Sequence, residues 1–391
     1  MNLNHLKENF EKLYKESEGA IFTFFAPGRV NLIGEHTDYN GGYVFPCALS
    51  FGTYLLIRKT DDAVIRFASA NFSFAAVVNL SDITKKQEDH WINYPLGVMN
   101  EFLKKGIKLT GMELLFSGNV PNGAGLSSSA SIEIVTAFAI NELFGAGLDG
   151  VELAKLGQRA ENLFVGVNCG IMDQFASAMG KKDSAIFLNC DTLDFELVPV
   201  VMTGFKLLIS NTNKRRGLSD SKYNERRSEC EKAVEYINSR KKIKNLGELT
   251  YDEFVGLQDS ISEENVFKRA RHVVTEIKRT VDAVAALKTG NLIKFGELMN
   301  GSHDSLRDDY EVTGKELDIL VEEARKINGV IGSRMTGAGF GGCTVSLVSE
   351  DSINRFIDEV GKNYHARTGL KADFYVADIG DGARKIVTSD E

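Results

Sequence analysis

The chain reads Val120-Pro-Asn-Gly-Ala-Gly-Leu-Ser-Ser-Ser-Ala130 shortly before a long apolar segment, residues 132–144. Paired glycines let the backbone bend closely around another group, and the apolar residues of the segment recur at helical spacing, which predicts a largely buried helix. A glycine-rich loop that leads into a helix presents unpaired backbone N–H groups at the positive end of the helix dipole. Phosphate binds at such ends, so the stretch predicts a phosphate-binding loop.

The alternative interpretation of this stretch is a glycine turn closed by a serine N-cap, which many helices have. A cap requires one hydroxyl and no glycine pair, whereas three consecutive serines, Ser127 to Ser129, follow a Gly-x-Gly here. We favour phosphate binding for that reason. The stretch is not a Walker loop, because Gly-x-x-x-x-Gly-Lys-Ser/Thr occurs nowhere in the sequence.

A second unusual stretch reads Gly28-Arg-Val-Asn-Leu-Ile-Gly-Glu-His-Thr-Asp-Tyr-Asn-Gly-Gly42. It follows a short apolar strand, predicted over residues 21–25, which we expect Ala26-Pro-Gly28 to end. Each polar residue alone would ordinarily be a solvated loop residue. Glu, His, Thr and Asp together between glycines instead indicate a loop that presents many hydrogen bonds to one polar ligand. A polyhydroxylated ligand such as a sugar fits, because each buried hydroxyl needs both a donor and an acceptor.

One carboxylate, Asp173, stands in an otherwise apolar run that begins Asn168-Cys-Gly-Ile-Met172. The run follows a helix predicted over residues 148–164 and ended by Gly166. An unpaired carboxylate is costly in apolar surroundings. Asp173 either accepts local backbone N–H bonds as a structural residue or is held for chemistry, and the sequence leaves both open.

A third glycine-rich stretch reads Ser333-Arg-Met-Thr-Gly-Ala-Gly-Phe-Gly-Gly-Cys343. Its letters match the dinucleotide fingerprint Gly-x-Gly-x-x-Gly, but a strand follows it, where the fingerprint requires a preceding strand and a following helix. We therefore reject a Rossmann fold. A loop that backs onto a phosphate or a sugar across a domain cleft is favoured over a flexible connector.

The length of 391 residues predicts two or three domains, and a polar turn at residues 180–183 is the predicted boundary. The formal net charge of −8 argues against a nucleic-acid partner, and no apolar run approaches the roughly 20 residues of a membrane helix. Five scattered cysteines without Cys-x-x-Cys fit reduced thiols in a cytoplasm and offer no zinc site. The N-terminus is polar and amphipathic, so we expect a surface helix over residues 3–16 rather than a signal peptide.

The second half of the sequence predicts long helices near residues 220–240, 265–288 and 292–307. Thr250-x-x-Glu253 and Thr313-x-x-Glu316 are predicted capping boxes. A strand, a helix and a strand near residues 343–348, 353–367 and 374–379 predict a βαβ-like or split βαβ unit. Further strands are predicted at residues 64–68, 75–80, 111–116, 184–188 and 205–211, and a further helix after Trp91.

Together, the three glycine-rich stretches resemble those of the galactokinases within the GHMP family of small-molecule kinases. Residues 28–42 look like the galactokinase signature without a gap. Residues 121–130 match the family's ATP-binding motif, and residues 333–343 match its third motif. The resemblance runs from about residue 20 to residue 380 in the family's order. One departure is Asn168, where galactokinases usually have proline.

The resemblance implies an α+β, two-domain GHMP kinase fold with the active site between the domains. Residues 1–180 would form an N-terminal domain like the second domain of ribosomal protein S5, and residues 181–391 a ferredoxin-like C-terminal domain. The implied activity is ATP-dependent phosphorylation of the anomeric hydroxyl of D-galactose to galactose 1-phosphate, the first committed step of the Leloir pathway. The implied protein is a cytoplasmic monomer that uses ATP and Mg²⁺ and has no nucleic-acid or membrane partner.

The resemblance also implies roles for individual residues. Asp173 would be the base that takes the hydroxyl proton, and Arg29 would stabilise developing negative charge. The sugar would be bound by Glu35, His36, Thr37, Asp38, Gly170 and Tyr223. The ATP phosphates would be wrapped by Gly123, Ala124, Gly125, Leu126, Ser127, Ser128 and Ser129, with Ser69 and Trp91 near the adenosine. Mg²⁺ would be held by Ser129 and Glu161.

Two other functions share these features. Another sugar kinase, such as an N-acetylgalactosamine kinase, would carry all three motifs, and no single residue distinguishes it. A galactose-sensing regulator that has lost catalysis would also share the fold. Such regulators lack the Ser-Ala pair of the phosphate loop, whereas Ser129-Ala130 and Asp173 are both present here. We therefore expect an enzyme.

Overall fold

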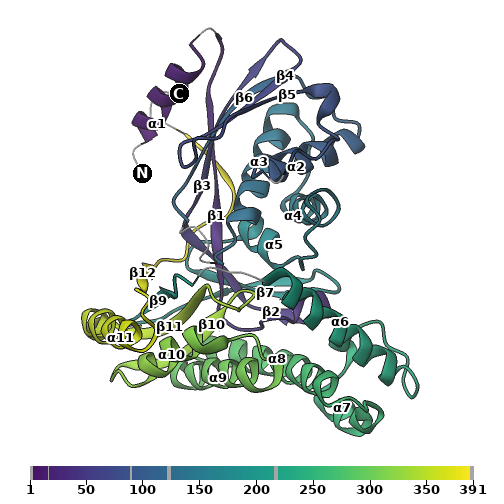
Figure 1. Ribbon diagram of the computed structural model, residues 1–391, viewed down its shortest axis with the longest axis vertical. Coiled ribbons are helices and arrows are strands. Elements are labelled where there is room, and N and C mark those ends of the chain that lie inside the picture. The colour runs from purple at the N-terminus through teal and green to yellow at the C-terminus, as the bar shows by residue number, and fades with distance from the viewer. Residues whose placement is uncertain (1–2, 16, 89, 121–124, 215–218, 388–391) are drawn as a thin grey trace.

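The computed structural model describes residues 3–15, 17–88, 90–120, 125–214 and 219–387. Figure 1 shows two lobes, with purple-to-teal segments forming the upper lobe and green-to-yellow segments most of the lower one. The predicted phosphate-loop residues Gly123 and Ala124 lie outside the described residues. No helix in the described ranges is long and apolar enough to cross a membrane.

A strongly twisted sheet forms the frame of the upper lobe (Figure 1). The prediction that Ala26-Pro-Gly28 ends the first strand is wrong, because this strand continues to Asn31. The proline is tolerated because the strand has a neighbour on only one side there, and the pairing register shifts between Pro27 and Arg29. In pairing order, the strands are β13 (Arg384–Ile386), β1 (Phe22–Asn31), β3 (Pro46–Thr60), β6 (Gly111–Gly118), β4 (Val64–Ser69) and β5 (Ala76–Asn79).

Helices cover both faces of this sheet. On one face, α1 (Leu3–Leu13) buries Leu6 and Phe10, which confirms the amphipathic N-terminal helix. On the other face the apolar core is closed by α2 (Asn93–Lys104), α3 (Ser128–Phe144), α4 (Gly150–Arg159) and α5 (Met172–Met179) (Figure 1). The helix α3 begins at Ser128, earlier than the apolar periodicity predicted, so two of the three serines lie in its first turn. A π-helical turn, Ala160–Val165, extends α4 up to Gly166, as predicted.

The lower lobe contains a second sheet. The predicted split βαβ unit is confirmed, because β11 and β12 both pair antiparallel with the strand between them and α11 connects them. The third glycine stretch joins β10 to β11, so a strand follows it, as the rejection of a Rossmann fold requires. In pairing order, the strands are β10 (Val330–Thr336), β11 (Cys343–Ser349), β9 (Phe205–Asn211) and β12 (Asp373–Ala377), and α11 spans Ile353–Thr368.

Helices α8 and α9 lie beneath this sheet in Figure 1, and α6 and α7 lie to one side. Thr250 and Glu253 form the predicted capping box at the start of α7. The second predicted box is wrong: Thr313 makes no side-chain cap bond, and Glu316 instead accepts from Lys214 Nζ at 2.6 Å. The helices are α6 (Ser219–Ile237), α7 (Tyr251–Leu257), α8 (Glu264–Lys288), α9 (Leu292–Ser305) and α10 (Gly314–Arg325).

A small third sheet lies where the lobes meet. It pairs β2 (Tyr43–Val44) with β7 (Ser184–Asn189) and β8 (Phe195–Pro199), of which β8 was not predicted. One apolar core contains residues of both lobes, such as Leu32 and Val345. Because elements on both sides of residue 180 share sheets and a core, the lobes pack as a continuous body, and the exact domain boundary stays a prediction.

Candidate active site

A cleft of about 370 Å³ lies between the lobes and collects residues from all three glycine-rich stretches. The stretch from Gly28 to Gly42 supplies one wall, the helices of the upper lobe supply another, and Gly337 and Ala338 of the third stretch complete the lining. Most of the predicted catalytic, sugar-binding and metal-binding residues line it. They are Arg29, Glu35, His36, Asp38, Ser129, Glu161, Gly170, Asp173 and Tyr223.

Asp173 lies in the first turn of α5 and forms a two-pronged ion pair with Arg29. The Nε–Oδ1 and Nη2–Oδ2 distances are 2.7 and 2.8 Å, and Arg29 is buried. A side-chain cation in the cleft, and not local backbone alone, thus holds the carboxylate, and the role of Asp173 in chemistry stays a prediction. Ser127 also donates to Asp173 Oδ2, from a backbone in the left-handed region at φ 60°. The Ser127 hydroxyl therefore faces the carboxylate.

The described part of the phosphate loop is tied to the same arginine. Arg29 Nη1 donates to the Gly125 carbonyl at 2.9 Å, and the Arg29 backbone N–H donates to the Leu126 carbonyl at 3.2 Å. The Leu126 side chain is buried in the apolar core that the lobes share. The end of the loop is consequently fixed to β1, while Ser128 and Ser129 begin α3.

Acidic side chains crowd the wall beside Ser129. Glu161 is bonded to Ser129 and accepts from Gln174 Nε2 at 2.6 Å, and burial together with the nearby Asp173 charge raises its pKa to about 7. The same Gln174 amide donates to Glu133 Oε2 at 2.9 Å, and burial raises the pKa of Glu133 well above its usual range. Burial therefore disfavours the charged forms of both carboxyls, and a nearby cation would stabilise them.

Within the described residues, no group of three or more His, Cys, Asp or Glu side chains is arranged to hold a metal ion. Ser129 and Glu161 together offer two oxygen donors. Mg²⁺ is usually bound by one or two carboxylates, with waters and substrate phosphates completing the octahedron. The pair therefore fits Mg²⁺ bound mainly through a nucleotide, rather than a closed protein site.

Glu35, His36, Asp38 and Tyr223 line the same cleft, and the polar stretch of residues 28–42 that carries the first three is named the sugar loop after its predicted ligand. Asp38 is partly buried, and burial and the Asp173 charge raise its pKa to about 7. Gly170 makes the close approach to Asp38 possible, because a Cβ there would lie 1.8 Å from Asp38 Oδ2. The Tyr223 ring is centred 5.7 Å from the His36 ring, and His36 Nδ1 is 2.9 Å from the Tyr39 hydroxyl. Burial lowers the pKa of His36 to about 3, so its imidazole is neutral.

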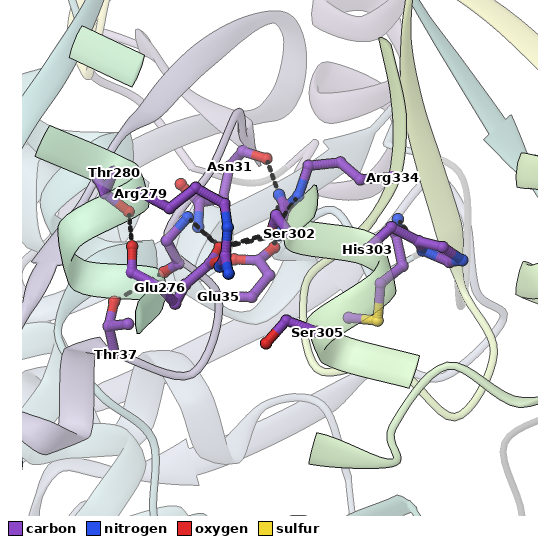
Figure 2. A network of polar contacts seen from close by, with 12 residues as sticks. Asn31, Glu35, Thr37, Glu276, Arg279, Thr280, Ser302, His303, Ser305 and Arg334 are labelled. Atoms are coloured by element: carbon purple, nitrogen blue, oxygen red, sulfur yellow. Dashed lines mark hydrogen bonds and ion pairs between the residues drawn. The ribbon is translucent and has the colours of Figure 1, made fainter. Parts of the chain in front are cut away.

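The side chains of Glu35 and Thr37 fix the conformation of the sugar loop through hydrogen bonds. The Glu35 carboxylate accepts from the Asn31 amide and from the Gly337 backbone N–H. The Thr37 hydroxyl lies 2.9 Å from the Gly34 carbonyl and 2.7 Å from that of Tyr43, and it does not line the cleft. Figure 2 shows Glu35 in a buried polar network that continues into the lower lobe. Thr37 therefore fixes the loop conformation, and its predicted contact with a sugar has no support in this geometry.

A smaller pocket beside the start of α3 brings Ser69 and Trp91 together, and their contact with the adenosine stays a prediction. Ser128 also lines this pocket, so the pocket and the cleft adjoin across α3. The Trp91 ring meets Phe116 edge-on at 5.3 Å. Phe72, which no sequence pattern singled out, lines the same pocket from the turn between β4 and β5 and is half exposed.

Family comparisons agree with this geometry. Residues 8–59 match the galactokinase galactose-binding signature, residues 93–181 the GHMP kinases N-terminal domain, and residues 283–366 the GHMP kinases C-terminal domain. A galactokinase of Fusobacterium nucleatum is 54% identical over 388 residues, which cover 98% of this chain and 100% of the relative. A galactokinase of Bacillus subtilis is 51% identical over 384 residues, covering 97% and 98%.

Solved structures show the same architecture. The structure of Lactococcus lactis galactokinase complexed with galactose superimposes with a TM-score of 0.96 at 46% identity, covering 98% of this chain and 100% of that one. The mevalonate kinase of Methanococcus jannaschii superimposes with a TM-score of 0.69 at 21% identity, which shows the fold alone. The two-lobed fold and the cleft with its glycine-rich loops define a small-molecule kinase of the GHMP class. Within that class, the chain belongs to the galactokinase family.

Proposed function

We propose that this chain transfers the γ-phosphoryl group of ATP to the anomeric hydroxyl of D-galactose and so produces galactose 1-phosphate, the first committed step of the Leloir pathway. The observation that carries the proposal is the cleft itself, in which polar residues of the galactose-binding signature face the Arg29–Asp173 pair. Relatives that share about half of this sequence from end to end are galactokinases.

Asp173 is the proposed base. Phosphoryl transfer asks the protein mainly for positioning and for stabilisation of charge. Asp173 accepts the proton of the anomeric hydroxyl as the oxygen attacks, and Arg29 fixes the carboxylate in place through its fork of donors. Once a proton lies on the carboxylate, the same arginine is free to offset the charge of the transferred group. Ser127 restricts Asp173 further through its hydrogen bond.

Mg²⁺ is proposed to bind at Ser129 and Glu161, together with the nucleotide phosphates. The raised pKa of Glu161 supports this, because burial and the nearby Asp173 charge raise it and a bound cation would offset both effects. When bound, the ion neutralises phosphate charge and helps to orient the nucleotide. In the protein, Ser129 supplies a hydroxyl from the first turn of α3, and Gln174 holds Glu161 from behind.

The sugar is proposed to be recognised by Asp38, His36, Glu35 and Tyr223, with Gly170 leaving room beside Asp38. Ser69 and Trp91 are proposed to contact the adenosine in the adjoining pocket. We further propose a cytoplasmic monomer. All five cysteines lie within the described residues and are free thiols, which fits a reducing compartment.

The proposed reaction is tested by ATP consumption with galactose, glucose and N-acetylgalactosamine, each assayed with and without Mg²⁺. We expect turnover with galactose that depends on the metal and far lower turnover with the other two sugars. Preferred use of N-acetylgalactosamine would assign the chain to a different sugar kinase activity. Galactose binding without ATP consumption would indicate a sensor and would refute the catalytic proposal.

A further inference from the structure

We propose that Arg334 is the positioning residue of the sugar site, which it holds in shape from the lower lobe without touching a ligand. The inference rests on the proposed function, because it concerns how the same cleft binds its sugar. Arg334 lies on β10, is completely buried and does not line the cleft. Figure 2 shows its side chain reaching from the lower lobe toward Asn31 and Glu35 of the upper one.

The guanidinium group joins the sugar loop to two elements of the lower lobe. Its Nη1 donates to the Asn31 carbonyl at 3.0 Å and lies 3.7 Å from Glu35 Oε1. Its Nε donates to Ser302 Oγ on α9 at 3.1 Å, and its Nη2 lies 3.8 Å from Glu276 Oε1 on α8. A planar, permanently charged fork can point at all these groups at once, which a lysine ammonium cannot do, although Nη2 faces Glu276 as an ion pair and has no hydrogen-bond partner among the described residues.

Arg334 also balances the charge of a cleft residue. Glu35 lies at the cleft wall yet is almost completely buried, and burial raises the pKa of its carboxyl. The Arg334 charge is the largest effect that opposes this rise. The Glu35 carboxyl accepts from the Asn31 amide through one oxygen and from the Gly337 N–H through the other, and both bonds favour its ionised form. Loss of Arg334 would therefore disturb the charge and the position of Glu35 together.

The neighbouring groups extend this support to the loop backbone. Glu276 Oε1 accepts the Gly34 N–H at 3.0 Å and also the Ser302 hydroxyl. His272 Nε2 lies 3.1 Å from the Glu35 carbonyl, which can only accept, so this nitrogen carries the proton. The loop from Asn31 to Glu35 is thus held by α8, α9 and β10 of the lower lobe. Arg334 pairs with the carboxylates of Glu35 and Glu276, and the other charged residue, Arg279, pairs with Glu276.

The expected consequence is selective. Glu35 and His36 belong to the sugar loop and line the cleft, whereas the proposed nucleotide contacts at Ser69 and Trp91 lie in the adjoining pocket. A substitution that removes contacts of Arg334 should thus reduce the affinity for galactose more than the affinity for ATP. A purely structural arginine would change the melting temperature and the fraction of active protein, but neither KM.

The experiment measures galactose affinity by calorimetry, the KM values for galactose and ATP, and the melting temperature. In Arg334→Gln we expect the galactose Kd and KM to rise about tenfold to a hundredfold, the range set by leaving a buried polar group unpaired. Arg334→Lys should recover part of this loss, because it keeps the charge but not the fork. The KM for ATP should stay within about twofold of wild type.

Ser302→Ala is the milder variant, which keeps the test usable if Arg334→Gln does not fold. It removes the hydroxyl that lies between Arg334 and Glu276, and we expect the galactose Kd to rise roughly threefold to tenfold. Its matched control is Ser346→Ala, which removes an equally buried hydroxyl bonded to Ser333 at 2.8 Å in the same lobe. The control for Arg334→Gln is Arg58→Gln, because Arg58 is also buried and pairs with Glu113, away from the cleft.

Changes in galactose affinity no larger than those in the two controls, at comparable losses of melting temperature, would overturn the inference. Equal increases in both KM values would also overturn it, because a positioning role at the sugar loop is selective. Absence of galactose binding by the wild-type chain would instead refute the proposed function. The Arg334 variants could fail to fold while Ser302→Ala binds galactose with wild-type affinity. That outcome would reject the positioning role and show that Arg334 serves stability alone.

Discussion

At the sugar-loop side of the cleft, the Glu35 carboxylate accepts two hydrogen bonds and faces a buried arginine. Beside Ser129, Glu161 is hydrogen-bonded to Ser129 and Gln174, whereas Glu133 behind it shares the Gln174 amide and its Oε1 atom has no hydrogen-bond partner among the described residues. The protein supplies the partners of the first group itself. Burial raises the pKa of both glutamates in the second group, so the protein stabilises their charged forms only in part. Under the proposed function, a cation that arrives with the nucleotide would stabilise these carboxylates, whereas the Glu35 side of the cleft binds a neutral sugar.

The largest effect should come from Asp173, which stands between the two walls. Asp173→Asn keeps the shape of the side chain but removes the proton acceptor and weakens the pair with Arg29. We expect turnover to fall by about 10²- to 10⁴-fold, the usual contribution of a general base, while galactose binding persists. The measurements are kcat by coupled assay and galactose affinity by calorimetry. Turnover within a few-fold of wild type would remove Asp173 from the catalytic role.

A change at the sugar-loop wall should alter sugar choice. Asp38 can accept two hydroxyl hydrogens, and each buried partner left unpaired costs about 1–3 kcal/mol, or roughly one to two powers of ten in affinity. Asp38→Ala should therefore lower kcat/KM for galactose steeply while hardly changing the poor activity on glucose. Tyr223→Phe should act in the same direction more mildly. If Asp38→Ala keeps the wild-type galactose-to-glucose ratio, this loop binds the sugar without selecting it.

A change at the acidic wall should instead alter the metal response. Ser129→Ala removes the hydroxyl bonded to Glu161. We expect the Mg²⁺ concentration for half-maximal activity to rise about tenfold, because a lost or misplaced metal contact typically costs at least that much, with little change in galactose affinity. The metal dependence would be measured by titrating activity with Mg²⁺ and by titrating Mn²⁺ binding with electron paramagnetic resonance. Poor folding with an unchanged metal dependence would favour the alternative interpretation, in which Ser129 only caps the helix.

The smallest expected effect is a pH dependence that couples the two walls. Burial and the Asp173 charge raise the pKa of Asp38 to about 7, so lower pH protonates Asp38 and removes an acceptor for the sugar. A single such group should weaken galactose binding roughly tenfold between pH 8 and pH 6. In the ligand-free protein the sign is opposite: the raised pKa makes Asp38 cost stability as pH rises from 3.8 to about 7.

Calorimetry of Asp173→Asn across the same pH range tests the cause of this shift. Without the Asp173 charge, the pKa of Asp38 should fall, and the binding transition should move to lower pH. Asp38→Asn, which cannot titrate, should show a flat profile. A transition that stays near pH 7 in Asp173→Asn would mean that burial alone sets the pKa of Asp38.

Local sequence patterns predicted the parts of the site that are continuous in the chain. The glycine–serine loop and the polar stretch from Gly28 to Gly42 both reach the cleft, as does Asp173. Contacts between distant residues carried no such pattern. The Arg334–Glu35 pair joins residues about 300 positions apart, so only the fold reveals it. Ser127 seemed one of three equivalent hydroxyls, because its left-handed backbone, which turns it toward Asp173, has no sequence signal.

For the helices and strands too, local sequence patterns predicted some features, and only the fold revealed others. Periodicity predicted most helices, but the letters Thr-x-x-Glu cannot tell a capping box at Thr250 from the unformed one at Thr313, where Lys214 competes for the glutamate. The proline and glycine at residues 27 and 28 predicted the end of a strand. The strand survives because Gly52, opposite Pro27, lets the two backbones approach: a Cβ at Gly52 would lie 2.1 Å from the Ala26 carbonyl.

The pairing of β13 with β1 has a consequence for how the protein is made. Ribosomes deliver β1 early, but the strand that covers its outer edge is about 360 residues further along the chain. At synthesis rates of about 5–20 residues per second, this edge waits roughly 20 to 70 seconds for Arg384 and its neighbours. An uncovered edge strand is a template for pairing with other chains. Nascent chains of this protein are therefore exposed to aggregation at Thr23–Phe25 throughout most of translation, and chaperone binding there would protect them.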